Sequence, residues 1–187
     1  MGETDDEERW ARQSRDGDHE AFANLVARHQ RMVHSVTIRM TGSLTEGEDL
    51  AQEVFIQAFR RLDTFRGEAK FSSWLYQIAV HACLNWRRNG ARRERAHADW
   101  GENERLLGQN PSAAPDADAG DESGQRVRDA LQKLPARQRA AVVLTIYEEM
   151  SHAEAARALG CSEITVSWRL FAARAKLKKL LGPALPR

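Results

Sequence analysis

The stretch SHAEAARALGCSEITVSWRLFAARAKLKKLL, residues 151–181, constrains the fold more than any other part of the chain. Ser151 and Glu154 form the S-x-x-E pattern of a capping box, which predicts the start of a helix. Gly160 can leave that helix with a positive φ, and Ser162 can cap a second one. The second helix has an apolar face at steps of three and four, made of Val166, Leu170, Ala173, Leu177 and Leu180 or Leu181.

The opposite face of this second helix carries side chains that the predicted core does not use: Ile164, Trp168, Phe171, Ala172, Ala175 and Lys179. This arrangement is typical of a helix-turn-helix, whose second helix lies in a DNA major groove. An ordinary αα-hairpin fits the same spacing and is the alternative. Two exposed aromatic residues, followed by Lys176, Lys178 and Lys179, favour the DNA-binding interpretation.

Charge is distributed unevenly along the 187 residues, although the formal net charge is only +1. Residues 69–95 have a net charge of +5, residues 96–124 of −6, and residues 125–187 of +7. Two basic blocks separated by an acidic connector indicate two contacts with polyanions. The connector is rich in Pro, Gly, Ala and Asp without periodicity, which predicts a flexible linker.

The remaining periodic segments are all helical. A helix is expected over 9–41, with Asp18 as a plausible N-cap and Gly42 at its end. Thr45 and Glu48 make a second capping box, before apolar residues that recur through Phe65. Short helices containing Val127, Leu131 and Leu134, and then Ala141, Val142, Leu144 and Ile146, are expected before the helix-turn-helix.

A further helix, predicted from about Ser72 to Asn89, has a stripe of mixed chemistry made of Trp74, Gln77, His81, Asn85 and Arg88. Aromatic rings that stack on bases and cations that hold phosphates are what single-stranded nucleic acid requires. Core packing of Trp74 and Trp86 is an equally good interpretation of the aromatic positions. The charged outer face of 49–61 is by itself weak evidence for a partner, because such faces are usually just solvated.

Several classes of function have no support in the sequence. It contains no phosphate-cradling glycine loop and no G-x-S-x-G, H-E-x-x-H or C-x-x-C motif, so no catalytic residues, metal ligands or cofactors are expected. Cys83 and Cys161 are interpreted as small apolar side chains rather than as a disulfide. The acidic N-terminus and the lack of a long apolar run predict a cytoplasmic protein without membrane insertion.

Taken together, two stretches resemble the extracytoplasmic-function (group 4) sigma factors of bacterial RNA polymerase. EDLAQEVFIQAFRRLDTFRGEAKFSSWLYQIAVHACLNWRR is similar to region 2, and LPARQRAAVVLTIYEEMSHAEAARALGCSEITVSWRLFAARAKLKKLL to region 4. The resemblance implies an all-α protein with two small helical domains joined by the flexible acidic linker. Residues 1–95 would form region 2, residues 96–124 the linker and residues 125–187 region 4.

The resemblance also implies roles for individual residues. Binding to the clamp helices of the largest polymerase subunit is assigned to Asp49, Gln52, Glu53 and Phe55. Recognition and melting of the −10 promoter element is assigned to Arg60, Arg61, Lys70, Trp74, Gln77, His81, Asn85 and Arg88. Recognition of the −35 element is assigned to Thr165, Ser167, Trp168, Phe171, Ala172 and Arg174.

This chain departs from the family pattern at positions that bear on base preference. His81 stands where the family commonly has Asn, and Trp168 replaces a usual Ser. Ser167 and Ala172 are uncharged where the family often has basic residues. Fewer guanine or phosphate contacts at −35 are therefore expected.

The partners implied by the resemblance are core RNA polymerase, through its clamp helices and flap, promoter DNA, and an anti-sigma factor in a stress or envelope response. Two alternatives from the residues alone are a self-sufficient helix-turn-helix regulator and a protein-interaction module. A plain regulator has no need of the 49–88 block, and an interaction module should show almost no salt-dependent DNA binding.

Overall fold

The structure, a computed structural model, describes residues 3–67, 69–99 and 122–182, and all regular elements in these ranges are helical. They are α1 (Glu3–Arg15), α2 (His19–Thr41), α3 (Leu44–Arg60), the 3₁₀ turn η1 (Leu62–Thr64), α4 (Phe71–Asp99), α5 (Glu122–Gln132), α6 (Ala136–Val142), the π turn η2 (Val143–Tyr147), α7 (His152–Leu159) and α8 (Glu163–Leu181). The expected all-α fold is confirmed. Most of the predicted acidic linker, residues 100–121, lies outside the described residues.

Two helix starts differ from the sequence prediction. The helix expected over 9–41 is divided at Gly17, whose φ of +96° ends α1 and lets Asp18 cap α2 through Glu20 N and Ala21 N. The capping box predicted at Thr45 and Glu48 is wrong, because Ser43 is the N-cap and its side chain accepts from Glu46 N. Gly42 with φ +83° turns the chain immediately before Ser43, so α3 begins as soon as an extended capping residue is available.

A second difference concerns the apolar residues before the helix-turn-helix. The helix expected to contain Ala141, Val142, Leu144 and Ile146 ends as α6 at Val142 and continues as η2. Ile146 in η2 is 55% exposed, and Val127 in α5 is 37% exposed. Ile146 lies in η2, where wider turns rotate side chains away from the 3.6-residue register used in the prediction. Leu131, Leu134 and Leu144 are buried as expected.

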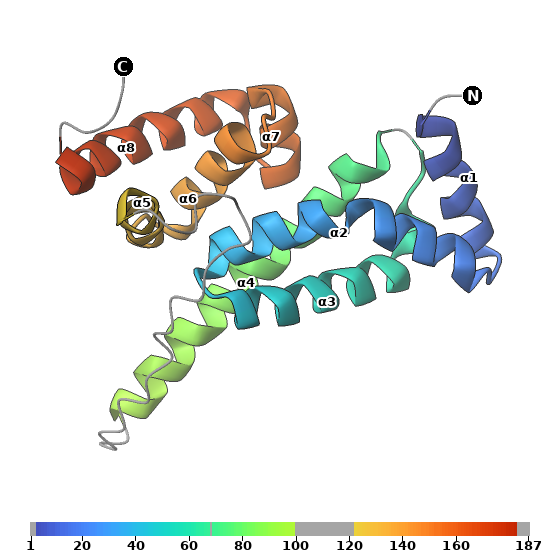
Figure 1. Ribbon diagram of the computed structural model, residues 1–187, viewed down its shortest axis with the longest axis horizontal. Helices are drawn as coiled ribbons and strands as arrows, with labels where there is room; N and C mark the ends of the chain where they lie inside the picture. Colours follow the sequence, from blue (N-terminus) through green and yellow to red (C-terminus); the bar gives the residue numbers. More distant parts are fainter. Residues whose placement is uncertain (1–2, 68, 100–121, 183–187) are drawn as a thin grey trace.

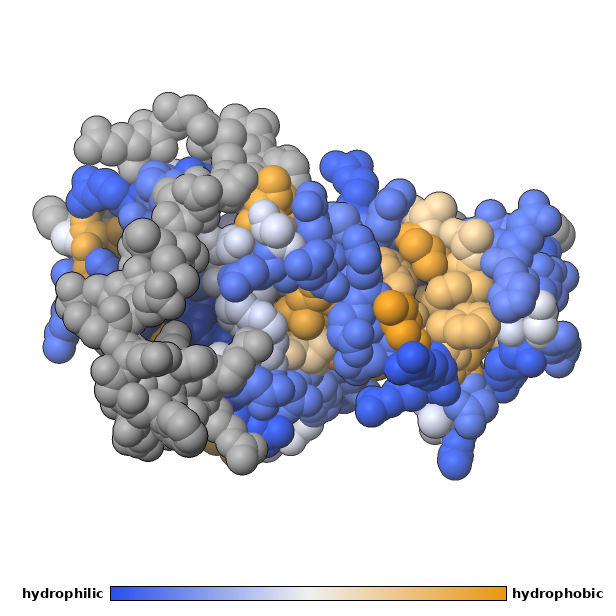
Figure 2. Space-filling view, turned by 90° about the horizontal axis from the view of Figure 1, so that it is seen from below, coloured by the Kyte–Doolittle hydropathy of each residue, from blue (hydrophilic) through white to orange (hydrophobic). Residues whose placement is uncertain are grey.

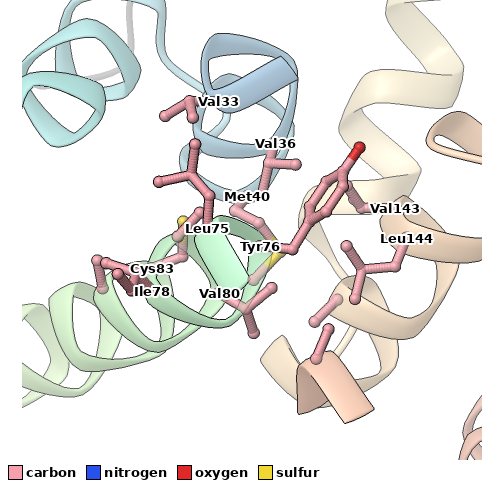
Figure 3. Close-up of a cluster of buried hydrophobic side chains, with 14 of the residues drawn as sticks. Val33, Val36, Met40, Leu75, Tyr76, Ile78, Val80, Cys83, Val143 and Leu144 are labelled. Carbon is pink, nitrogen blue, oxygen red and sulfur yellow. The ribbon is translucent and has the colours of Figure 1, made fainter. Parts of the chain in front are cut away.

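The helices form two groups that pack against each other along α4 (Figure 1). Helices α2 and α3 pack on α4, α1 packs on α2, and α6 and α7 also contact α4. Figure 3 shows Val36, Tyr76, Val80 and Leu144 among side chains from α2, α4 and η2 that point toward one another. The buried apolar residues of both groups belong to one contiguous cluster, so the N-terminal and C-terminal helices are docked and not merely tethered.

Polar contacts fasten α5 and α6 to the C-terminal end of α2. The guanidinium of Arg139 is completely buried, and it donates to Leu131 O at 2.9 Å and to Met40 O at 2.6 Å. The amide of Gln132 donates to Arg39 O at 2.9 Å. These bonds satisfy carbonyls that the last turn of a helix leaves without an intrahelical partner.

A second polar contact joins η2 to α2 and α4. The hydroxyl of Tyr76 donates to Glu148 Oε2 at 2.7 Å, and the hydroxyl of Ser35 donates to the other oxygen of that carboxylate. The guanidinium of Arg39 lies 4.4 Å from the centre of the Tyr147 ring. In the part of the chain that the structure describes, no helix is both long and apolar enough to cross a membrane.

Candidate nucleic-acid interface

The helix-turn-helix forms at the predicted residues. Ser151 and Glu154 make a complete capping box at the start of α7, in which each side chain bonds to the other residue's backbone N–H. Gly160 ends α7 in the left-handed region with φ +59°. The side chain of Ser162 then caps α8 by accepting from Thr165 N at 3.2 Å. Local sequence signals therefore fix both helices and the turn between them.

Helix α8 buries one side and exposes the other, as its periodicity predicts. Val166, Leu170 and Ala173 are buried against the other C-terminal helices. Three large apolar side chains point into solvent on the opposite side, and we call Ile164, Trp168 and Phe171 the apolar recognition face. They are 72%, 68% and 67% exposed, respectively. Large apolar side chains gathered on one exposed side are typical of an interaction site, so this face is a strong candidate for a binding surface.

The remaining residues predicted to contact the −35 element surround this face. Ser167 and Arg174 are exposed, whereas Thr165 and Ala172 are half-buried. The hydroxyl of Ser167 lies 3.0 Å from His152 Nδ1 and donates to Glu163 O at 3.1 Å. The structure thus brings the predicted −35 residues onto one side of α8, with Ser167 held by contacts within the protein.

The stripe on α4 is divided between solvent and protein contacts. His81, Asn85 and Arg88 are exposed, and His81 Nδ1 lies 2.7 Å from Gln77 O. Gln77 is half-buried, and its amide donates to Arg157 O of α7 at 3.4 Å. Helix α7 therefore lies beside the middle of the stripe that was predicted to meet unpaired bases.

Trp74 is partly packed in the core and partly exposed, and the sequence was compatible with either environment. Its ring is half-buried and lies 5.6 Å from Phe65 and 5.3 Å from Phe71, centre to centre. Part of the indole is thus a core group, and the rest can receive a stacking base. The other cations assigned to the −10 element, Arg60, Arg61 and Lys70, are exposed in and beside the segment that connects α3 to α4.

The residues assigned to polymerase binding separate into exposed and packed side chains. Asp49, Gln52 and Glu53 are exposed on α3, and Glu53 accepts from the Gln57 amide at 2.8 Å. Phe55 is half-buried and packs against the core. Its ring therefore supports α3 from within more than it presents a contact surface.

Sequence reasoning missed two apolar residues on the outer side of α3. Ile56 is 46% and Phe59 40% exposed. The Phe59 ring packs edge-to-face against Phe22, with the ring centres 4.9 Å apart, and lies tilted against His19 at 5.8 Å. Figure 2 shows apolar surface between hydrophilic flanks on the face seen from below, toward the end where α1 lies. The signal was available, since Ile56 and Phe59 follow Gln52 and Glu53 at helical spacing.

Both cysteines are free thiols. Cys83 is buried in the core, and this burial raises its pKa to about 12. Cys161 lies in the turn between α7 and α8, where its sulfur accepts from Arg169 Nη1 at 3.3 Å. Cys83 thus behaves as a small core side chain, and Cys161 helps to position Arg169.

Two family models match the chain in the order in which the two helical groups occur. Sigma-70 region 2 matches residues 25–93, and Sigma-70, region 4 matches residues 124–177. The first range contains α3 and the stripe of α4, and the second contains the helix-turn-helix.

Relatives with known names align over most of their length. The ECF RNA polymerase sigma factor SigM of Mycobacterium tuberculosis is 38% identical over 166 residues, which are 89% of this chain and 80% of SigM. The RNA polymerase sigma-H factor of Pseudomonas aeruginosa is 33% identical, over 90% of each chain. The ECF RNA polymerase sigma-E factor of Escherichia coli is also 33% identical, over 91% of this chain and 92% of its own.

Two solved structures share the fold. CnrH, in complex with the cytosolic domain of CnrY, superposes with a TM-score of 0.68 and 29% identity, over 96% of this chain and 99% of CnrH. The sigma factor RpoE of Bartonella quintana, in complex with the anti-sigma factor NepR, also has a TM-score of 0.68. RpoE is only 22% identical, over 88% of this chain and 98% of its own, and it supports the fold alone.

Proposed function

The chain belongs to the extracytoplasmic-function sigma factors of bacterial RNA polymerase. From this premise we propose which of its surfaces bind the polymerase and which bind the promoter. A sigma factor binds core RNA polymerase and directs promoter-specific initiation of transcription. It is a transcription initiation factor, so we expect its functional residues to bind and position polymerase and promoter DNA and not to catalyse a reaction. We assign region 2 to residues 1–95 and region 4 to residues 125–187, connected by residues 96–124.

Three surfaces carry the proposed activity. The exposed residues Asp49, Gln52 and Glu53 of α3, extended by Ile56 and Phe59, bind the polymerase. The α4 stripe, with the cations at the α3–α4 connection, binds the opened −10 element through stacking and phosphate contacts. The exposed side of α8 enters the major groove at −35, where duplex DNA can be read without being opened.

The observation that carries this proposal is the presence, in one chain, of two exposed surfaces with different chemistry. One face of α8 exposes Ile164, Trp168 and Phe171. The α4 stripe combines a half-buried indole with exposed amide, imidazole and guanidinium groups. A conventional regulator requires only the first, whereas an initiation factor must also hold melted DNA.

A controlling partner is also part of the proposal. CnrH was solved in complex with the cytosolic domain of CnrY, and by analogy we propose that an anti-sigma factor binds the present chain. Such a partner would cover the polymerase-binding and DNA-binding surfaces. Co-purification from the native host, followed by release of transcription activity when the partner is removed, would test this point.

Run-off transcription is the direct test of the function. Core RNA polymerase would be incubated with a library of promoter fragments, with and without this protein. Specific initiation that appears only with the protein would establish sigma activity and give the −35 and −10 sequences. Tight binding of the protein alone to one duplex site, without initiation, would indicate a conventional regulator instead.

A further inference from the structure

The apolar recognition face of α8 has unusual chemistry for a surface that reads base edges. Ile164, Trp168 and Phe171 present only hydrocarbon and aromatic surface, apart from the indole N–H. The rings of Trp168 and Phe171 lie 6.0 Å apart, centre to centre, at 85°. This edge-to-face packing holds both rings in place, so the surface is organised before any ligand arrives.

The hydrogen-bonding groups on the same turns are largely engaged within the protein. Ser167 contacts His152 and Glu163 O, and the hydroxyl of Thr165 lies 2.9 Å from Ser162 Oγ. Arg169 is half-buried and donates to Cys161. The usual bidentate readers of guanine and adenine are Arg, Lys, Asn and Gln, and over 163–171 the described helix has only this Arg169. Glu163 is an acceptor and can read the amino group of cytosine.

Thymine is the base whose major-groove edge suits such a surface, because its C5-methyl group is apolar. Resting on the function proposed above, we infer that α8 selects thymines in the −35 element by burying their methyl groups against Ile164, Trp168 and Phe171. Exposed cations further along the same helix, Arg174, Lys176, Lys178 and Lys179, hold the neighbouring phosphates. Specificity would thus come from apolar contact and affinity from charge.

A protein partner is the competing occupant of this face, since large exposed apolar patches also bind proteins. The charge of the surroundings favours DNA. Residues 125–187 carry a net charge of +7, and three lysines lie on the same helix as the exposed rings. A purely apolar docking site would not need this excess of cations, whereas a phosphate backbone does.

Replacing thymine by deoxyuridine tests the inference, because it removes the methyl group and leaves the base-pairing edge intact. The −35 sequence would first be recovered by run-off transcription with core polymerase and the full chain. Each −35 thymine would then be replaced singly, with thymines between the two promoter elements as controls. We expect holoenzyme affinity to fall about fourfold for each contacted methyl, the size typical of one buried methyl group. The control positions should not respond.

Variants connect the effect to the named side chains. Trp168→Ala and Phe171→Ala should bring the thymine-to-deoxyuridine ratio close to one at the positions they contact. Arg174→Ala is the matched control, which should weaken binding to both templates equally. All three positions are exposed, so the variants are expected to fold, and circular dichroism would verify this.

The outcomes separate this inference from the proposed function. Initiation that is indifferent to deoxyuridine at every −35 position would overturn the inference and leave the sigma role intact. Full activity and an unchanged ratio in both aromatic variants would also overturn it and assign the face to a protein partner. Absence of initiation from every promoter would refute the proposed function and the inference with it.

Discussion

At the scale of single residues, Arg139 joins the C-terminal helices to α2. Its guanidinium is fully buried and donates to main-chain carbonyls of Met40, Leu131 and Leu134. Burial lowers the pKa of Arg139 to about 9, so the side chain is still charged at neutral pH. The hydrogen-bond partners of this cation are carbonyl oxygens and not a carboxylate. Its contribution to stability therefore depends on each of its N–H groups having a hydrogen-bond acceptor.

Replacing Arg139 by Met should destabilise the protein by about 3 kcal/mol, because charge-assisted hydrogen bonds are lost and buried carbonyls are left without donors. Urea unfolding at neutral pH would measure the free energy of unfolding. Arg137→Met, on the exposed side of the same helix, is the matched control and should change it by less than about 0.5 kcal/mol. Equal effects in the two variants would show that the Arg139 bonds are unimportant.

His29 gives the fold a dependence on pH. Its ring is buried, with Nε2 3.2 Å from Glu7 Oε1, and Arg28 Nε lies 3.2 Å from the same oxygen. Burial first, and the Arg28 cation second, lower the pKa of His29 from 6.5 to about 4. Because Arg28 already neutralises Glu7, the carboxylate does not compensate for the cost of a charged imidazole.

The sign of the effect follows from the lowered pKa. Between about pH 6.5 and 4 the unfolded chain binds a proton at His29 that the folded chain does not, so stability is lost as the pH falls. With allowance for solvent screening, we expect a loss of roughly 1 kcal/mol between pH 7 and 5. Urea unfolding at the two pH values would measure it. His29→Gln should reduce the difference, whereas His81→Gln, at an exposed position, should not.

At the scale of elements, the outer side of α3 combines polar and apolar groups. Gln52 and Glu53 are exposed beside Ile56 and Phe59, a pattern typical of an interface in which apolar anchors are surrounded by polar residues. Phe59 is also held by its contact with Phe22, so little side-chain entropy remains to be lost on binding.

Phe59→Ala should therefore weaken binding to core polymerase about tenfold or more, as truncation of an interface anchor commonly does. Gln52→Ala together with Glu53→Ala should also weaken it. Titration of labelled protein with core enzyme would give both dissociation constants. Gln30→Ala, an exposed amide on α2, is the matched control for Gln52→Ala. Unchanged affinity in all the α3 variants would place the polymerase contact elsewhere.

Helix ends set by capping residues next to them in the sequence were predictable, except where two neighbouring residues could serve as the cap or where a helix was interrupted. Ser151, Gly160 and Ser162 set the helix-turn-helix because capping bonds act within three residues. Thr45 offered an equally good local pattern, but Ser43 caps α3 because the Gly42 turn comes first. The division at Gly17 was missed although the polar stretch 12–20 and the predicted cap at Asp18 both indicated a break there. In both cases the sequence allowed two local structures, and the prediction chose the wrong one.

The candidate binding surfaces also combine features that were predictable from the sequence with features that were not. Exposure of Trp168 and Phe171 follows from helical spacing and was predicted correctly. Burial of Arg139 and the contact of Gln77 with α7 were not predictable, because they join residues that are 80 or more positions apart. Pairings at such separation depend on how the two helical groups dock, and periodicity carries no information about docking.

At the scale of the whole molecule, the docking of the two groups bears on DNA binding. Helix α7 packs along α4, and the Gln77 amide bonds to Arg157 O. In this arrangement the Gln77 amide is engaged by α7, whereas the His81, Asn85 and Arg88 side chains are exposed. Under the proposed −10 assignment, use of the complete stripe requires α7 to move away from α4, and we expect the contacts that dock the groups to oppose promoter binding.

The Tyr76–Glu148 hydrogen bond makes this argument testable. Burial first, and then the bond to Glu148, raise the pKa of Tyr76 well above its ordinary value, so the hydroxyl stays protonated and donates at any physiological pH. Glu148→Ala removes the acceptor of both Tyr76 and Ser35, and a charge-assisted bond of this kind is worth about 1.5–3 kcal/mol. The ratio of docked to undocked molecules should fall by about tenfold or more.

Two measurements on the full chain would follow the change. Small-angle X-ray scattering should show a larger radius of gyration for Glu148→Ala, and holoenzyme containing it should bind promoter DNA more tightly, because less docking energy opposes exposure of Gln77. Glu48→Ala, on the exposed side of α3, is the matched control. A larger radius without tighter promoter binding would mean that docking does not limit access to the stripe. An unchanged radius would mean that the apolar core shared by α2, α4 and η2 holds the groups together without this bond.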